Sequence, residues 1–145
     1  MGLEPFRKAE YRGRKWHLTD AEWRERLSEE QYKILRERAT EPPFSGSYLE
    51  LTEEGTFLCA GCALPLFSSE DKFESGSGWP SFTKPLEPEN LSYRRDTSHS
   101  MDRVEILCSR CGSHLGHVFE DGPAPTELRY CVNSKALDFE EEMES

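Results

Sequence analysis

The spacing of apolar and polar residues divides the chain into a helical first part and a strand-rich remainder. Residues 19–22 and 28–31 each fit a capping box, in which a hydroxyl receives a backbone N–H while a Glu or Gln side chain reaches back. Good helix formers follow the second box. They carry one apolar face, made by Tyr32, Ile34 and Leu35. The first 40 residues are therefore predicted to be helical, and Pro42 and Pro43 are expected to end the helical region.

Beyond residue 43, short runs rich in β-branched and aromatic residues predict strands. They cover residues 56–58, 104–107 and 128–133, and clusters of Gly and Pro separate them. Helices followed by strands indicate an α+β or mainly β domain. The expected fold is therefore mainly β, with helices at the N-terminal end.

Composition narrows the class of protein. The chain has 145 residues, of which 35% are hydrophobic and 11% aromatic, enough for one packed domain. Its longest apolar run covers only residues 57–60, so no membrane span is expected, and a formal net charge of −10 argues against broad nucleic-acid binding. No basic stretch followed by an apolar stretch opens the sequence, so we expect no secretory signal. The expectation is a soluble cytoplasmic protein with no nucleic-acid or membrane partner.

The uneven distribution of charge suggests where the domain lies. Residues 1–40 carry ten basic and eight acidic side chains, whereas residues 41–145 carry eight and twenty. We expect an N-terminal extension at residues 1–18, a single domain at residues 19–139, and an acidic tail at residues 140–145. Residues 138–144 are expected to form a frayed, solvated end.

The five cysteines suggest a metal site. Four of them form two Cys-x-x-Cys pairs, namely Cys59, Cys62, Cys108 and Cys111. Two residues between thiolates let a tight turn aim both sulfurs at one ion, and two such turns complete a tetrahedral four-sulfur site. The pattern predicts one structural Zn²⁺. Two redox pairs, ordinary buried cysteines, or a mixed site that includes His114 or His117 are the alternatives.

The fifth cysteine, Cys131, is left without a partner of this kind. In a strand at residues 128–133 it would share one face with Arg129 and Asn133, opposite an apolar face. A neighbouring guanidinium and nearby imidazoles lower a thiol pKa and make the sulfur a better nucleophile. An unpaired cysteine can equally be a small buried hydrophobe. The local pattern leaves both interpretations open.

Two more segments contain candidate site residues. In a strand, His117 and Phe119 would share a face, although a lone histidine is often structural. Gly76 and Gly78 precede Trp79 in a loop that could present the indole to a pocket, or bury it at a turn.

Seven segments form a distinctive series along the chain: Cys59–Cys62, Glu74–Phe82, Asp96–His99, Cys108–Gly112, His114–Phe119, Asp121–Pro123 and Leu128–Ser134. Together they resemble the peptide methionine sulfoxide reductases of the B type. The resemblance runs from about Thr19 to Phe139. It implies two antiparallel sheets with N-terminal helices, a structural zinc in two Cys-x-x-Cys knuckles, and reduction of methionine-R-sulfoxide in oxidised proteins.

The resemblance also implies roles in catalysis. Cys131 would attack the sulfoxide sulfur and become a sulfenic acid. The sulfoxide oxygen is a poor leaving group, so it needs protons and hydrogen bonds, which His114, His117 and Asn133 would supply. Arg129 would hold the Cys131 thiolate charged.

The remaining implications concern substrate and recycling. Trp79 would pack against the substrate methyl group, and Phe119 would also bind substrate. Many members of the family carry a resolving cysteine where Ser77 stands, and a serine cannot form a disulfide. An external thiol, thioredoxin-like or glutaredoxin-like, is therefore expected to regenerate the enzyme. A zinc-stapled interaction module without turnover is the alternative, which the reactive thiol disfavours.

Overall fold

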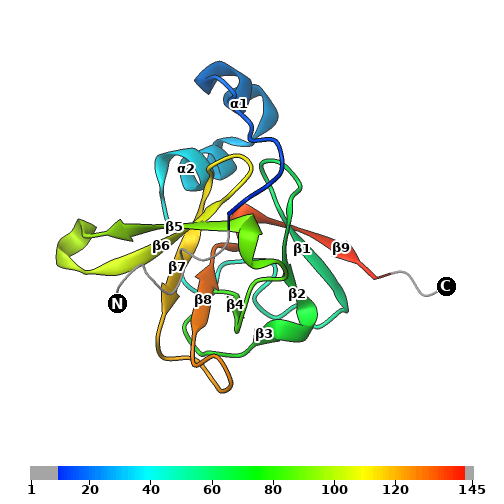
Figure 1. Ribbon diagram of the computed structural model, residues 1–145, viewed down its shortest axis with the longest axis vertical. Helices are drawn as coiled ribbons and strands as arrows, with labels where there is room; N and C mark the ends of the chain where they lie inside the picture. Colours follow the sequence, from blue (N-terminus) through cyan, green and yellow to red (C-terminus); the bar gives the residue numbers. More distant parts are fainter. Residues whose placement is uncertain (1–9, 143–145) are drawn as a thin grey trace.

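The computed structural model describes residues 10–142, which form two antiparallel β-sheets (Figure 1). The strands are β1 Gly55–Cys59, β2 Pro65–Ser68, β3 Lys72–Phe73, β4 Ser81–Phe82, β5 Leu91–Asp96, β6 Arg103–Cys108, β7 His114–Phe119, β8 Arg129–Val132 and β9 Leu137–Glu141. One sheet has the order β3-β4-β8-β7-β6-β5 and the other has the order β2-β1-β9. The predicted class, mainly β with N-terminal helices, is confirmed.

Aromatic side chains from both sheets form the core between them. Phe57 and Phe67 of the smaller sheet pack on Phe82 of the larger one, with ring centroids 5.1 and 4.3 Å apart. All three rings are fully buried. On β8, Tyr130 and Val132 point into this core, so the intervening residue faces the opposite side of the sheet.

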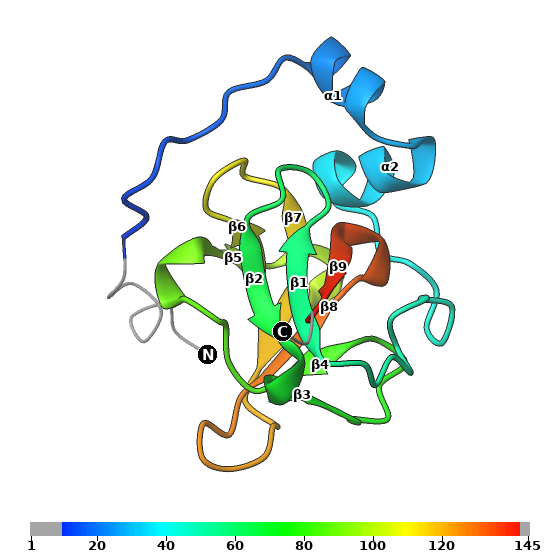
Figure 2. The ribbon, with the colours of Figure 1, turned by 90° about the vertical axis from the view of Figure 1, so that its right-hand side faces the viewer.

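Two helices cover one end of the sheets, close to the β1–β2 and β6–β7 turns (Figure 2). They are α1 (Asp20–Arg26) and α2 (Glu29–Glu37), and both predicted capping boxes are formed. The predicted apolar face of α2 is buried, as its low exposure shows at Tyr32, Ile34 and Leu35. These local predictions are therefore confirmed.

The end of α2 differs from the prediction. The helix stops at Glu37, before Pro42 and Pro43, because Arg38 adopts a left-handed conformation with φ of 61°. The Arg38 side chain then reaches the larger sheet, where its Nε donates to Glu105 Oε2 at 3.1 Å. A contact distant in sequence thus ends the helix earlier than the prolines would.

The segments at both ends of the domain were only partly anticipated. The prediction of helix is wrong for residues 10–18. There the chain has no helix and runs along the β6–β7 turn, where the Trp16 N–H donates to the Arg110 carbonyl at 2.7 Å. The expectation of a frayed end at residues 138–144 is wrong for residues 138–141, because they pair with β1 as part of β9. The Glu142 N–H also donates to the Glu54 carbonyl at 2.8 Å. Residues 143–145 of the tail and residues 1–9 of the expected extension lie outside the described residues.

Hydropathy along the helices agrees with the short apolar runs of the sequence. Within residues 10–142, neither helix has the length and apolar character that a bilayer span requires.

Candidate active site and metal centre

A cavity of about 160 Å³ opens on the face of the larger sheet that points away from the core. Most of the residues singled out in the sequence line it, namely Trp79, His117, Phe119, Arg129, Cys131 and Asn133. Thr40, Ser77 and Arg103 also line the cavity and add further polar side chains to its wall. Residues far apart in sequence thus surround the unpaired cysteine.

Sheet register brings Cys131 beside its neighbours. On β8 it lies opposite His117 of β7 on one side and Ser81 of β4 on the other. The two central strands approach closely at Gly116, where a Cβ atom would lie 1.9 Å from the Cys131 carbonyl oxygen. Only glycine fits there, which explains why a glycine directly precedes His117.

The environment of the Cys131 sulfur combines burial with positive charge. Burial raises the pKa of the thiol above its ordinary value, whereas the Arg129 guanidinium and the nearby Ser77 hydroxyl act in the opposite direction. Asp121 holds Arg129 in place, with two hydrogen bonds of 2.8 and 3.1 Å to the guanidinium. The guanidinium also lies 4.4 Å from the ring centroid of Phe119.

His117 is held by a carboxylate. Its Nε2 donates to Asp96 Oδ2 at 2.7 Å, and Asp96 Oδ1 accepts from both the backbone and the hydroxyl of Ser98 at 3.0 and 2.6 Å. Burial lowers the pKa of His117, the Asp96 hydrogen bond raises it, and the nearby charge of Arg103 lowers it. The balance is a lowered pKa, so the imidazolium would give up its proton readily.

His114 occupies a different position from that expected. Its Nδ1 donates to Glu105 Oε2 at 2.6 Å, and its ring meets the His117 ring edge-on at 5.5 Å. Among the described residues, the cavity wall does not include His114, and its buried Nε2 has no hydrogen-bond partner. His114 therefore lies behind His117.

The loop that follows α2 connects two cavity residues. The Glu41 backbone carbonyl accepts from Trp79 Nε1 at 3.0 Å, and the Glu41 N–H donates to Asn133 Oδ1 at 3.1 Å. Asn133 Nδ2 donates to the Leu115 carbonyl at 3.1 Å, which leaves its second hydrogen for another acceptor. Trp79 is half-buried at the cavity wall.

Sequence reasoning missed three carboxylates. Asp96, Glu105 and Glu41 are almost fully buried, with exposures of 5%, 0% and 2%. Buried carboxylates need partners, and here the partners come from other strands or loops. A local pattern carries no signal for such pairs.

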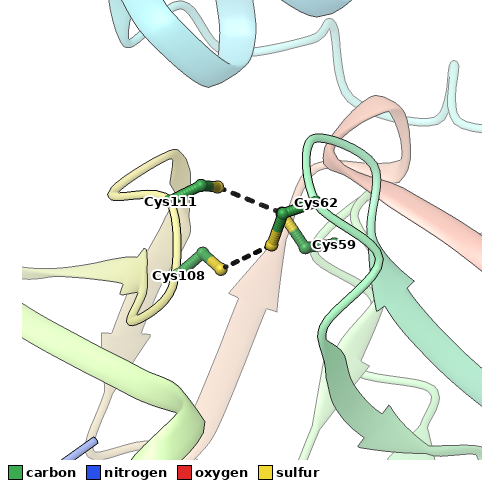
Figure 3. Close-up of side chains that lie close together, drawn as sticks. All are labelled: Cys59, Cys62, Cys108 and Cys111. Carbon is green, nitrogen blue, oxygen red and sulfur yellow. Dashed lines mark hydrogen bonds between the residues drawn. The ribbon is translucent and has the colours of Figure 1, made fainter. Parts of the chain in front are cut away.

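Four cysteine sulfurs meet at the turns beneath the helices (Figure 3). The β1–β2 turn supplies Cys59 and Cys62, and the β6–β7 turn supplies Cys108 and Cys111. All four sulfurs lie within 4.8 Å of one another, with 3.7 Å between Cys59 and Cys111 and 3.5 Å between Cys62 and Cys108. Such a cluster can hold one metal ion, and it confirms that the two Cys-x-x-Cys pairs come together. Among residues 10–142, the group that could hold a metal ion contains these four cysteines and no histidine.

Three arginines bind the backbone of these turns. Arg26 of α1 donates to the Gly61 carbonyl at 2.6 Å, Arg36 of α2 donates to the Cys111 carbonyl at 2.9 Å, and Arg110 donates to the Cys62 carbonyl at 3.0 Å. The two helices are therefore attached to the cysteine cluster.

The fold and the cavity together define a β-protein with one cysteine nucleophile candidate and a separate four-cysteine metal centre. A family model described as the SelR domain matches residues 27–141. Over 121 residues the chain is 58% identical to a peptide methionine sulfoxide reductase MsrB of Thiobacillus denitrificans, covering 83% of this chain and 92% of the relative. The MsrB protein of Leptospira interrogans is 52% identical over 124 residues, covering 86% and 95%. The chain belongs to the MsrB family of peptide methionine sulfoxide reductases.

Proposed function

We propose that this protein reduces methionine-R-sulfoxide in oxidised proteins, with Cys131 as the nucleophile. The carrying observation is that Cys131 shares one cavity with an indole, an imidazole, a guanidinium and an amide. A binding module needs no such group of reactive and proton-donating side chains around a thiol. Turnover of a peptide methionine-R-sulfoxide with dithiothreitol as reductant, compared with the S epimer, tests the proposal. No turnover of the R epimer would contradict it.

In the proposed reaction, oxygen passes from the substrate to Cys131. The thiolate sulfur attacks the sulfoxide sulfur and forms a transient sulfur–sulfur bond. That bond and the sulfur–oxygen bond of the substrate then break as a sulfur–oxygen bond forms on Cys131. The substrate sulfur gains two electrons and becomes a thioether, while the Cys131 sulfur loses two and becomes a sulfenic acid. His117 donates the proton that the departing oxygen requires, and Asn133 offers its free amide hydrogen. His114, itself held by Glu105, packs against the His117 ring.

Substrate binding is assigned to Trp79, with Phe119 on the same wall. We expect Trp79→Ala to lower kcat/KM by about 10- to 100-fold, because a large apolar contact to the substrate methyl is lost. Trp79→Phe keeps an aromatic ring but loses the hydrogen bond to Glu41. Its kcat/KM should therefore fall less than that of Trp79→Ala. Steady-state kinetics on a sulfoxide peptide give the values, with metal content as the control. Unchanged activity in Trp79→Ala would show that this indole does not bind substrate.

Asp96 is expected to keep His117 protonated to higher pH. Asp96→Asn removes a charge that raises the pKa of His117, while burial, Arg103 and His114 continue to lower it. The pKa of His117 should therefore fall further, and the alkaline limb of the pH–rate profile should move to lower pH by about one unit. Asp102→Asn is the matched control, because Asp102 pairs with exposed Arg95 on the same hairpin. An unmoved alkaline limb in Asp96→Asn would contradict this role.

The metal of the four-cysteine cluster is proposed to be one structural zinc. Sulfurs bound to Zn²⁺ at about 2.3 Å in a tetrahedron lie about 3.8 Å apart, close to the observed separations. Four thiolates fill the coordination shell, so the ion would supply folding stability and take no part in the reaction.

The oxidised enzyme is proposed to depend on an external thiol. Two thiols reduce the sulfenic acid to Cys131 and water and become a disulfide themselves, and a thioredoxin-like or glutaredoxin-like protein could provide them. Metal-bound and reactive thiols both suit a reducing compartment, which favours the cytoplasm. We propose residues 19–141 as the catalytic domain, since β9 extends to Glu141, preceded by an extension at residues 1–18.

A further inference from the structure

Ser77 lies beside the nucleophile but has no role in the reaction described so far. It comes from the loop between β3 and β4 and lines the same cavity as Cys131. Its neighbours Gly76 and Gly78 have φ of 76° and 96°, a left-handed backbone that few other residues adopt. The loop is therefore shaped around Ser77, and β4, which follows it, pairs with β8 directly at Cys131.

Three serine hydroxyls form a chain in this loop. Ser77 Oγ lies 2.8 Å from Ser75 Oγ, and Ser75 Oγ lies 2.8 Å from Ser81 Oγ. Ser81 Oγ donates to the Trp79 carbonyl at 3.1 Å. Each hydroxyl has one hydrogen, and Ser81 uses its own on the Trp79 carbonyl. Ser75 therefore donates to Ser81, and the direction of the Ser77 hydrogen is the one that remains to be assigned.

Among the groups of this hydroxyl series, the Ser77 hydrogen has only neutral acceptors. It can point to Ser75 Oγ, which already accepts the Ser77 N–H at 3.2 Å, or to the Trp79 carbonyl at 3.4 Å. An anionic acceptor forms a stronger hydrogen bond than a neutral one. Ionisation of Cys131 would supply such an acceptor in the cavity that the two residues share.

We propose that Ser77 is a catalytic residue whose hydroxyl donates a hydrogen bond to the Cys131 thiolate, and then to the oxygen of the sulfenic acid. The catalytic meaning rests on the proposed function, whereas the hydrogen bond to the sulfur is a property of the resting protein. The Ser77 proton is not consumed, because the proton that the oxygen takes up comes from His117. Ser75 and Ser81 orient the hydroxyl and are positioning residues.

The charged groups around Cys131 agree with a need for such a donor. Burial raises the pKa of the thiol, and the carboxylate of Asp121 acts in the same direction. Arg129 on the same strand and the Ser77 hydroxyl lower it. His117 lies across the sheet on β7, and Arg103 of β6 reaches the cavity wall. Since Arg129 is already paired with Asp121, its charge is partly neutralised, and a second donor to the sulfur gains importance.

The test measures the pKa of Cys131 directly in the full-length protein. The rate of Cys131 alkylation by iodoacetamide is followed from neutral to strongly alkaline pH, and mass spectrometry confirms the labelled residue. We expect Ser77→Ala to raise the midpoint of the profile by about half a unit or more, so that alkylation below the midpoint slows by roughly 3-fold or more. Ser75→Ala removes a more distant hydroxyl and should shift the midpoint less. Dithiothreitol-dependent turnover of Ser77→Ala should fall in parallel below the midpoint.

An isosteric pair controls for disturbed packing. Ser77→Thr and Ser77→Val have nearly the same shape and differ in the presence of the hydroxyl. The threonine variant should keep a midpoint near that of the parent, and the valine variant should behave like Ser77→Ala. Equal midpoints in the threonine and valine variants would overturn the assignment of Ser77. Because alkylation needs no substrate, this result is independent of whether the protein reduces methionine sulfoxide.

Discussion

Replacement of Cys131 by serine is expected to lower the reduction of methionine-R-sulfoxide by at least about 1,000-fold, to the uncatalysed background. A serine hydroxyl stays protonated at neutral pH and cannot accept the substrate oxygen in the way that sulfur does. The other four cysteines are buried with exposures of 0–5% at the metal centre, so none of them can substitute for the missing thiol. Steady-state turnover with excess dithiothreitol measures the effect.

The same variant should leave the rest of the protein unchanged. Cys131 is half-buried at a cavity wall and lies on the face of β8 opposite the core, so a serine there should fold normally. Metal content and melting temperature are therefore expected to match those of the parent. Turnover in Cys131→Ser above one-tenth of the parental rate would rule out Cys131 as the nucleophile.

Replacement of Cys59 by serine is expected to have the reverse effect, a large loss of stability together with loss of metal. Zinc held by four thiolates contributes directly to the free energy of folding, and both helices are attached to its turns through Arg26 and Arg36. We expect metal content well below one ion per chain and a melting temperature lower by roughly 10 °C or more. Metal analysis and thermal unfolding measure the two quantities on the same sample.

Cys59→Ser and Cys131→Ser form a matched pair, since both exchange one cysteine for serine in one protein. The first should change metal content and stability, and the second should change turnover. A Cys59→Ser protein that loses its metal but melts at the parental temperature would contradict a structural role for the metal.

Those parts of the fold that depend on local pattern could be predicted from the sequence. The capping boxes and the apolar face of α2 require contacts within one turn or two, and both are formed. On β8, alternation correctly separated Cys131 from Tyr130 and Val132, because the side-chain period of a strand is two residues. The strand ends at Val132, however, and Asn133 reaches the cavity as the residue before a short 3₁₀ turn.

The partners of the histidines could not be predicted in this way. Glu105 alternates with apolar residues in the run 104–107, a pattern that favours an exposed side chain, yet it is fully buried. It is buried because Arg94, Arg38 and His114 surround its carboxylate, and they come from β5, the end of α2 and β7. Such a network depends on sheet register, which a single sequence does not reveal.

The most direct test of the account is a single turnover without reductant. The protein is mixed with an equimolar peptide methionine-R-sulfoxide, and the released methionine peptide and the intact protein mass are measured. We expect close to one methionine peptide per protein, one added oxygen on Cys131, and metal still bound, since Ser77 offers no thiol to resolve the sulfenic acid. A disulfide between Cys131 and one of the four metal-centre cysteines, with release of the metal, would contradict this account, as would the absence of any methionine product.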